Sequence, residues 1–298
     1  ESVIRSELLL DEGDPFSSLK LEQSIAKLKA RNIFGEVKQT ISDGSSKNLK
    51  IIDIEVEEKP TGEISAGAGV GTNGGSFAFN IKENNWLGKG ITIASFLDLD
   101  KDSIKGQLSL RDPNYNMSGN ELNYNISSIQ TDKTQESGYK NTITSLGVGT
   151  RFEQYQDIYL APSLNYSHDS LTVDDSASTS LQKQEGSFSD LAFSYSIQQD
   201  KRDKAYMPTD GFYSAFSQTI PVYADAPYLR NSYRFSKYNS FGKDLVGAFK
   251  IYGSAINGLN DEDVRLSKRN FLSSNNLRGF KNGKVGPKDG QDFVGGNY

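Results

Sequence analysis

The sequence predicts a mainly β fold, an antiparallel transmembrane β-barrel preceded by a small α+β domain. Beyond residue 60, apolar residues alternate with polar or small ones at a period of two, and no helical pattern interrupts them. The chain is rich in Gly (28), Tyr (15) and Phe (16) and poor in Met (2), which is typical of an aromatic-rich β protein. It contains no run of roughly 18 apolar residues, so a membrane-spanning helix is excluded. If the protein crosses a membrane, it must therefore do so as a barrel.

The composition also narrows the chemistry. Without Cys, the chain offers no disulfide, no thiolate metal site and no cysteine nucleophile. A net charge of −5 and a pI near 5.2 argue against nucleic acid as the main partner. The mean hydropathy of −0.57 permits a barrel, because barrel strands alternate. The chain does not begin with Met or a signal-like segment, and it ends where a new strand begins, so we expect a fragment of a longer protein.

The first domain, residues 1–59, is predicted to run helix, helix, strand, strand. The second helix is the clearest element, because apolar residues recur on one face and a serine precedes them. The elements are a short helix over 3–9, a helix that begins at Ser17 or Ser18 and buries Leu21, Ile25 and Leu28, and two strands over 36–41 and 49–56. Pro60 interrupts regular strand structure, so the second domain is predicted to cover residues 60–298.

The second domain is predicted to be a meander of eleven antiparallel strands, with a twelfth beginning near Val294. The clearest strands carry alternating apolar residues at Phe77/Phe79/Ile81, Ile104/Leu108/Leu110, Leu122/Tyr124/Ile126, Ile158/Leu160/Leu164/Tyr166 and Leu191/Phe193/Tyr195/Ile197. Others are indicated at 62–71, 89–98, 138–151, 211–220, 229–241 and 245–256.

The connections between these strands are predicted to alternate in length. Short to moderate ones lie near 85–88, 112–119, 153–156, 200–211 and 242–244, and longer ones at 132–137, 168–186, 224–228 and 260–292. Short turns on one rim and long loops on the other are the pattern of outer-membrane barrels, with the short turns periplasmic. The alternatives are a β-sandwich, which the strand count and the lack of Greek-key spacing disfavour, and a β-solenoid, for which no repeat is visible.

The first barrel strand, at 62–71, is predicted to be weak. Six glycines fall between residues 62 and 75, and each weakens a strand by roughly 0.5–1 kcal/mol. The first strand of a closed barrel pairs with the last, so we expect a gate at this seam formed by Gly67, Gly69, Gly71, Gly74 and Gly75. The alternative, that glycine only relieves crowding at a bend, stays open on sequence grounds.

Four further motifs have simpler interpretations. His168–Ser170 has the letters of a hydrolase triad, but it is predicted to lie in a polar loop, and adjacency is not triad geometry. Gly67–Gly71 superficially resembles a phosphate loop, but a strand follows it instead of a helix. Asp200–Asp203 and Pro208–Gly211 indicate a charged, solvated turn. Trp86, the only Trp, suits an interfacial anchor, although it could equally pack under its turn.

Near the end of the chain, a long loop at about 257–293 carries an unusual arginine. Arg278 lies between apolar neighbours, with a glycine beside it that permits a tight turn. On composition alone, it is either a solvated loop arginine or a fixed cation presented to a carboxylate. The surrounding motif consists of Leu277-Arg278-Gly279-Phe280, then Gly286-Pro287-Lys288, then Gly295-Gly296-Asn297.

These segments closely resemble, in order, the loop-six signature of the BamA family of bacterial outer-membrane protein insertases. The family signature is V-R-G-F followed by G-P-K and G-G-N, so Leu277 replaces the usual Val. The turns Asn85-Trp86-Leu87-Gly88 and Pro208-Thr209-Asp210-Gly211 match turns of the family, and residues 9–37 resemble its last POTRA domain. The resemblance spans nearly the whole chain.

The resemblance implies a barrel of about 16 strands, of which about 11 to 12 are present here. They would follow the last POTRA domain, which lacks its first strand in this sequence. It also implies that Arg278 folds into the barrel with its loop and pairs with acidic groups on later strands, which this sequence does not contain. An open sheet with two free edges is not expected to insert stably on its own.

The implied function is the insertion of β-barrel proteins into the bacterial outer membrane, without enzymatic activity or a cofactor. The POTRA domain would lie in the periplasm and bind extended clients by β-augmentation, and the weak first strand would template their folding. The implied partners are outer-membrane lipid, nascent outer-membrane proteins and accessory assembly lipoproteins. The alternative is an export pore of the related two-partner-secretion class, which carries a similar Arg-Gly-Phe loop. A passive channel or a barrel enzyme is a weaker third possibility.

Overall fold

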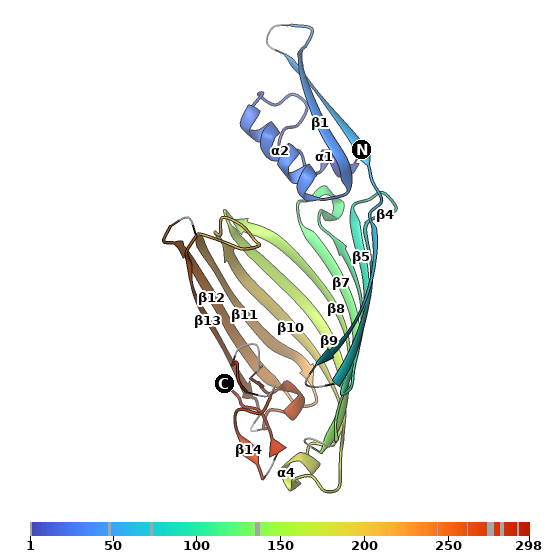
Figure 1. The fold of residues 1–298 in the computed structure, drawn as a ribbon, viewed down its shortest axis with the longest axis vertical. Helices are drawn as coiled ribbons and strands as arrows, with labels where there is room; N and C mark the ends of the chain where they lie inside the picture. Colours follow the sequence, from blue (N-terminus) through green and yellow to red (C-terminus); the bar gives the residue numbers. More distant parts are fainter. Residues whose placement is uncertain are drawn as a thin grey trace.

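The computed structural model describes residues 2–46, 49–71, 74–134, 138–242, 244–260, 262–272, 277–280, 283–290 and 292–298. A small α+β domain stands at one end of a large curved sheet (Figure 1). The small domain contains α1 (Ser2–Arg5), α2 (Ser18–Ala30), β1 (Phe34–Asp43) and β2 (Lys50–Glu58). Within these ranges, none of the helices has the length and apolar character needed to cross a membrane.

Helix α2 forms where the sequence predicts it. Ser17 caps its N-terminus, and the side chain accepts a hydrogen bond from the backbone N–H of Lys20 (3.4 Å). Leu21, Ile25 and Leu28 are buried against the antiparallel hairpin that β1 and β2 form. The amphipathic pattern therefore gives both the helix and the core of this domain.

The first helix is shorter than the 3–9 expected, because it ends at Arg5. The backbone N–H of Leu9 donates to the hydroxyl of Ser24 on α2 (2.8 Å), and Ser24 is buried. In a longer helix, this N–H would donate to the carbonyl of Arg5 instead. The hydrogen bond to α2 therefore draws the chain out of helical geometry.

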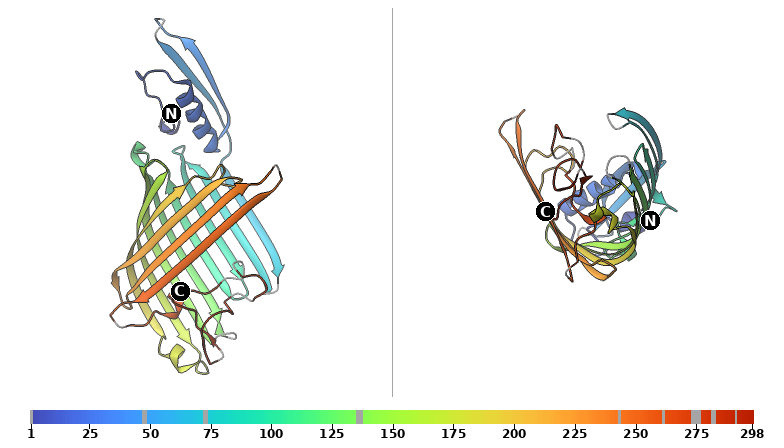
Figure 2. Two further views of the ribbon diagram at one scale, coloured as in Figure 1. Left: turned by 90° about the vertical axis from the view of Figure 1, so that its left-hand side faces the viewer. Right: turned by 90° about the horizontal axis from the view of Figure 1, so that it is seen from below.

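The second domain is a single antiparallel sheet of 11 strands in sequence order, which confirms the predicted meander. Its strands are β3 (Gly62–Gly71), β4 (Gly74–Trp86), β5 (Ile91–Asp100), β6 (Ser103–Asp112), β7 (Glu121–Lys133), β8 (Tyr139–Tyr155), β9 (Ile158–Val173), β10 (Gly186–Asp200), β11 (Gly211–Ala224), β12 (Tyr228–Ser240) and β13 (Val246–Gly258). Seen from below, the sheet curves into an open trough whose edges are β3 and β13 (Figure 2).

The two faces of the sheet differ in polarity. Directly paired residues share a face, so the register links apolar residues across neighbouring strands on the convex side, where they are exposed. Val148, Leu164 and Phe193 form one such row. The concave face carries polar and small residues, including Ser167 and Asp169 of β9 and Asp190 of β10. This is the arrangement expected of a barrel wall with an apolar exterior and a polar interior.

The connections lie on the rims to which the sequence assigned them. However, short and long connections do not separate cleanly between the two rims. The turns after β4 and β6 lie at the rim beside the α+β domain: Arg31 donates to the carbonyl of Gly90 (2.8 Å), and Asn114 donates to that of Ser6 (3.2 Å). The opposite rim has the helix α4 (Thr179–Gln182) and the C-terminal segment, but also the two-residue connection between β5 and β6.

Two expectations about strands are wrong. His168–Ser170 lies within β9 and not in a loop, because β9 continues to Val173. The strand expected near Val294 is not part of the sheet. Instead, β15 (Asp292–Phe293) pairs with β14 (Lys288–Asp289), and Asn297 accepts a backbone hydrogen bond from Ile256 of β13 (2.7 Å).

Candidate functional site

The glycine-rich first strand, β3, forms one free edge of the described sheet. Its register with β4 pairs Gly67 with Ala78, Gly69 with Ser76 and Gly71 with Gly74. These three glycines alternate with Ala66, Ala68 and Val70, so they all lie on the concave face. Val70 on the convex face is 93% exposed. At these positions, β3 therefore has no side chains on its concave face and small apolar side chains on its convex face.

Steric crowding does not explain why residue 67 is a glycine. A Cβ added there would have no atom within 4 Å, and a Cβ at Gly75 would have only the carbonyl oxygen of Gly69 within that distance, at 3.9 Å. Gly69 is tighter, because its Cβ would lie 3.3 Å from the hydroxyl of Ser76. Gly74, at a φ of +110°, occupies a conformation that side chains rarely adopt. Glycine therefore weakens β3 at Gly67 and the start of β4 at Gly75, although neither position is too crowded for a side chain.

The turn Asn85-Trp86-Leu87-Gly88 connects β4 to β5 beside the α+β domain. The side chain of Asn85 closes it by accepting a hydrogen bond from the backbone N–H of Gly90 (2.7 Å). Arg31 of the small domain bonds to Gly90 and lies 3.5 Å from Glu7. Trp86 is half-exposed and pairs with Ile91 at the end of the strand, so it does not pack under the turn.

The second turn, Pro208-Thr209-Asp210-Gly211, is organised by Asp203. This carboxylate accepts hydrogen bonds from the hydroxyl and backbone N–H of Thr209 and the N–H of Asp210, and they hold its pKa well below the usual range. Gly211 has a φ of +94°, and a Cβ there would lie 2.0 Å from the carbonyl oxygen of Lys201. The charged turn is therefore exposed, as expected, but rigidly hydrogen-bonded.

The loop-six motif lies on the rim far from the α+β domain. Arg278, Gly279 and Phe280 are exposed, Leu277 is half-buried, and within the described ranges Arg278 makes no ion pair or hydrogen bond. The pairing of Arg278 with acidic groups on later strands thus stays a prediction.

The remaining part of the motif, residues 286–297, makes several contacts. Pro287 accepts a backbone hydrogen bond from Val294 (3.1 Å), and the ammonium of Lys288 lies 4.4 Å from the ring centre of Phe293. Gly296 forms an antiparallel bridge with Asn270. Gly286 precedes this hairpin, and Gly295 and Asn297 flank the bridge; Gly295 is buried, Gly286 is exposed and Asn297 is half-buried.

Two other cations of the same loop pair with carboxylates of the sheet, and the sequence did not single them out. The ammonium of Lys268 lies 2.8 Å from Asp190 of β10. The guanidinium of Arg265 lies 3.7 Å from Asp169 of β9, and both side chains are buried. We call Arg265, Lys268, Asp169 and Asp190 the loop anchor. It joins the C-terminal segment to the concave face of the sheet.

Neighbouring contacts support the loop anchor. The guanidinium of Arg265 stacks on the ring of Phe188, 3.2 Å from its centre. The hydroxyl of Ser267 donates to Asp169, and the N–H of Leu266 donates to the side chain of Gln184 (2.6 Å). A small apolar core surrounds these groups, formed by Leu171, Val173, Leu181, Leu266 and Val294.

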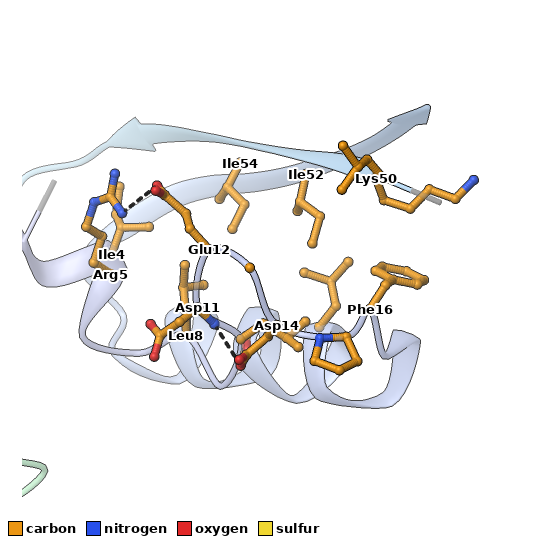
Figure 3. Close-up of a pocket in the computed structure, with 16 residues that line it drawn as sticks. Ile4, Arg5, Leu8, Asp11, Glu12, Asp14, Phe16, Lys50, Ile52 and Ile54 are labelled. Carbon is orange, nitrogen blue, oxygen red and sulfur yellow. Dashed lines mark hydrogen bonds and ion pairs between the residues drawn. The ribbon is translucent and has the colours of Figure 1, made fainter. Parts of the chain in front are cut away.

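The α+β domain contains a cavity of about 670 Å³ between the α1–α2 connection and β2 (Figure 3). Ile52 and Ile54 of β2 form its apolar wall, and Ile4 and Leu8 face them. Arg5 and Glu12 pair at its rim (3.1 Å). Within the described residues, the sheet of this domain consists of β1 and β2, and the cavity lies against β2.

Comparisons with known proteins agree with this architecture. The model of the Omp85 superfamily domain matches residues 85–298, more than two thirds of the chain. The POTRA model, described as a surface antigen variable number repeat, matches residues 1–59. The two matches fall on the sheet and on the α+β domain.

An outer membrane protein assembly factor BamA from Neorickettsia risticii is 26% identical over 306 residues, which cover 100% of this chain and 41% of that protein. The chain spans about two fifths of the length of its curated BamA relatives. The crystal structure of BamA from Haemophilus ducreyi lacking POTRA domains 1–3 superposes with a TM-score of 0.82 at 22% identity, covering 99% of this chain and 62% of that one.

CdiB from Acinetobacter baumannii superposes less well, with a TM-score of 0.55 at 14% identity, covering 95% of this chain and 54% of that one. At these identities, the superpositions establish the fold. Together with the family models, they identify the architecture: the chain belongs to the Omp85 superfamily and joins a POTRA domain to its barrel sheet, as the BamA proteins do.

Proposed function

We propose that the protein folds β-barrel proteins and inserts them into the bacterial outer membrane. The observation that carries the proposal is the first barrel strand β3, which has glycine at three positions of its concave face and pairs with β4 in a register in which Gly71 meets Gly74. Relatives named as outer membrane protein assembly factors, which align with the whole chain, support this role.

The first step of the mechanism is capture in the periplasm. A free strand edge presents unpaired backbone donors and acceptors, which an extended client can pair by β-augmentation. The POTRA domain would thus hold clients in an extended, strand-like form.

The second step is templated folding at the seam. Unpaired backbone groups are intolerable in hydrocarbon, so a client strand must be paired as it enters the membrane. A first strand that separates readily from its closing partner offers a free edge at which each client hairpin can pair. Client folding supplies the free energy, and no enzymatic step or cofactor is required.

This role implies a location and a set of partners. The barrel would lie in the outer membrane, with its apolar convex face against lipid and the POTRA domain in the periplasm. Nascent outer-membrane proteins would be its clients, and accessory assembly lipoproteins its neighbours. An export pore of the two-partner-secretion class is the less supported alternative, because the relatives named for membrane-protein assembly match the full chain.

The test is reconstitution of the full-length protein with its partners into liposomes. We expect an unfolded client barrel to fold faster than in protein-free liposomes, as measured by the heat-dependent shift of its band on a gel. Extraction at high pH separates the two functions, since an inserted client stays with the membrane and an exported one is released. A client that folds no faster than in protein-free liposomes, or one that is only released, would refute insertion.

A further inference from the structure

We propose that Arg265 and Lys268 are positioning residues, which fix loop six to a part of the barrel wall that stays still while the β3 seam opens. This inference rests on the proposed insertase function. The loop anchor holds the segment before the loop-six motif, from Arg265 to Lys268, against the concave face of β9 and β10.

The first support is the character of the contacts. Both cations come from the loop and both carboxylates come from neighbouring strands, and the register places them on one face: Asp169 pairs with Phe188, and Asp190 with Ser167. Lys268 also donates to the hydroxyl of Ser167 (3.2 Å). Two separate ion pairs thus attach one short segment to two adjacent strands, which fixes its orientation as well as its position.

The second support is burial. Asp169 has no exposed surface and Arg265 is 6% exposed, so neither charge can be solvated where it lies. The guanidinium is held by the charge of Asp169 and by the ring of Phe188. A buried charge tolerates little displacement from its counter-charge, because the interior does not replace the lost attraction. The loop segment is therefore confined to its place on the wall.

The third support is the place of the loop anchor in the sheet. Strands β10 and β9 are fourth and fifth from β13, whereas they are eighth and seventh from β3. Separation of β3 from its closing partner would leave both ion pairs intact. The loop can then keep the motif at a constant depth in the barrel while a client enters at the seam.

The first experiment locks the loop anchor. The described part of the protein is free of Cys, so Lys268→Cys with Asp190→Cys in the full-length protein, made Cys-free elsewhere, can be joined by a short bis-methanethiosulfonate linker that reductant removes. We expect the cross-linked protein to fold clients in liposomes at a rate within twofold of the wild-type protein, because the linker takes the place of the ion pair that the two substitutions remove. A tenfold loss that reductant reverses would overturn the proposal, because the loop would then have to leave the wall.

The second experiment breaks the loop anchor and restores it. Lys268→Asp should expose the loop to protease and slow client folding at least fivefold, and Lys268→Asp with Asp190→Lys should recover at least half of both losses. The matched control is the same exchange at the partly exposed pair Lys105 and Asp98 (3.6 Å), which should change neither protease protection nor client folding. Heat-dependent gel mobility verifies that each barrel is folded.

The two readouts separate this inference from the proposed function. If the wild-type protein does not accelerate client folding, the insertase function fails, but protease protection still tests the loop anchor. If Lys268→Asp leaves both protection and client folding at wild-type levels, the positioning role is refuted. Loss of protection that the charge exchange does not restore also contradicts it, since a positioning pair must act through its charges.

Discussion

The first strand and the wall formed by β9 and β10 are parts of one sheet, yet they are built for opposite purposes. Strand β3 has 10 residues and carries three glycines on its inner face. Strands β9 and β10 have 16 and 15 residues. Their inner face holds the two ion pairs of the loop anchor and an apolar core.

The difference shows how a sheet can yield at one place only. Each interior glycine weakens β3 by about 0.5–1 kcal/mol, whereas removing one partner of a buried ion pair destabilises a structure by about 3–5 kcal/mol. We therefore expect opening to be easiest at β3, and the wall that holds the loop to be the last part to move. Four substitutions test this contrast.

The largest effect is expected for Asp169→Ala in the wall. The substitution leaves Arg265 buried without its nearest counter-charge, so we expect a loss of about 3–5 kcal/mol in stability. Denaturant unfolding of the full-length protein in detergent measures it. The matched control is Asp98→Ala, whose pair with Lys105 has nearly the same separation but is partly exposed to solvent, and which should cost at most about 1 kcal/mol. Equal losses of stability in the two variants would show that burial of the Arg265–Asp169 pair does not contribute to the stability of the wall.

The wall also shows where sequence reasoning stops. The alternation of Leu160, Leu164 and Tyr166 predicted the start of β9 correctly. His168–Ser170 was assigned to a loop because three consecutive polar residues interrupt the apolar alternation: Asp169 faces the polar interior, whereas His168 and Ser170 are polar residues on the outer face. The sequence does contain one signal for these carboxylates. Continuing the period-two alternation of the two recognised strands places both Asp169 and Asp190 at inward-facing positions.

The loop anchor itself depends on tertiary contacts that no local pattern encodes. Ser267 and Asp169 are 98 residues apart in the chain, and Leu266 and Gln184 are 82 apart. The motif around Arg278 is recognisable as a local sequence, whereas Arg265 and Lys268 resemble ordinary loop cations. Local propensity also gave the Ser17 cap and the turn at Asn85 correctly, because neighbouring residues determine both.

The next largest effect is expected for Arg278→Ala in the full-length protein. If Arg278 is paired there with acidic groups of later strands, its removal should cost up to about 3–5 kcal/mol locally, and less in a wet barrel interior. Limited proteolysis should reveal a looser loop, and the assembly of clients should fall. The cut sites should lie after Phe271, because the loop anchor still holds the preceding segment. Wild-type assembly with unchanged protease sensitivity would refute the role of Arg278.

A smaller effect is expected for Phe188→Leu, which removes the ring beneath Arg265. A desolvated cation–π contact contributes about 2 kcal/mol, and an exposed one about 0.5–1 kcal/mol. The control is Tyr213→Leu, since Tyr213 lies 5.1 Å from the guanidinium of Arg202, which also pairs with Asp200. Denaturant unfolding should rank Phe188→Leu as the more destabilising of the two. The reverse order would indicate that Arg265 is held by Asp169 alone.

The smallest effect is expected at the edge, for Gly67→Val. A Cβ at this position has no atom within 4 Å, so the side chain should be accommodated and should order β3 by about 0.5–1 kcal/mol. Amide hydrogen exchange of β3 should slow by roughly two- to fivefold, and client folding in liposomes should slow by a similar factor. The matched control is Gly106→Val on β6, an interior strand, where a Cβ has equally open surroundings. It should leave both rates unchanged.

The combination of the two rates decides what the glycines do. Slower exchange in β3 with unchanged client folding would separate the looseness of the strand from templating, and the seam would lose its proposed role. Slower client folding in both Gly67→Val and Gly106→Val would instead make the whole sheet the yielding element. Only an effect confined to β3 preserves the contrast, because it places the flexibility at the edge while Asp169 and Asp190 keep the opposite wall and its loop in place.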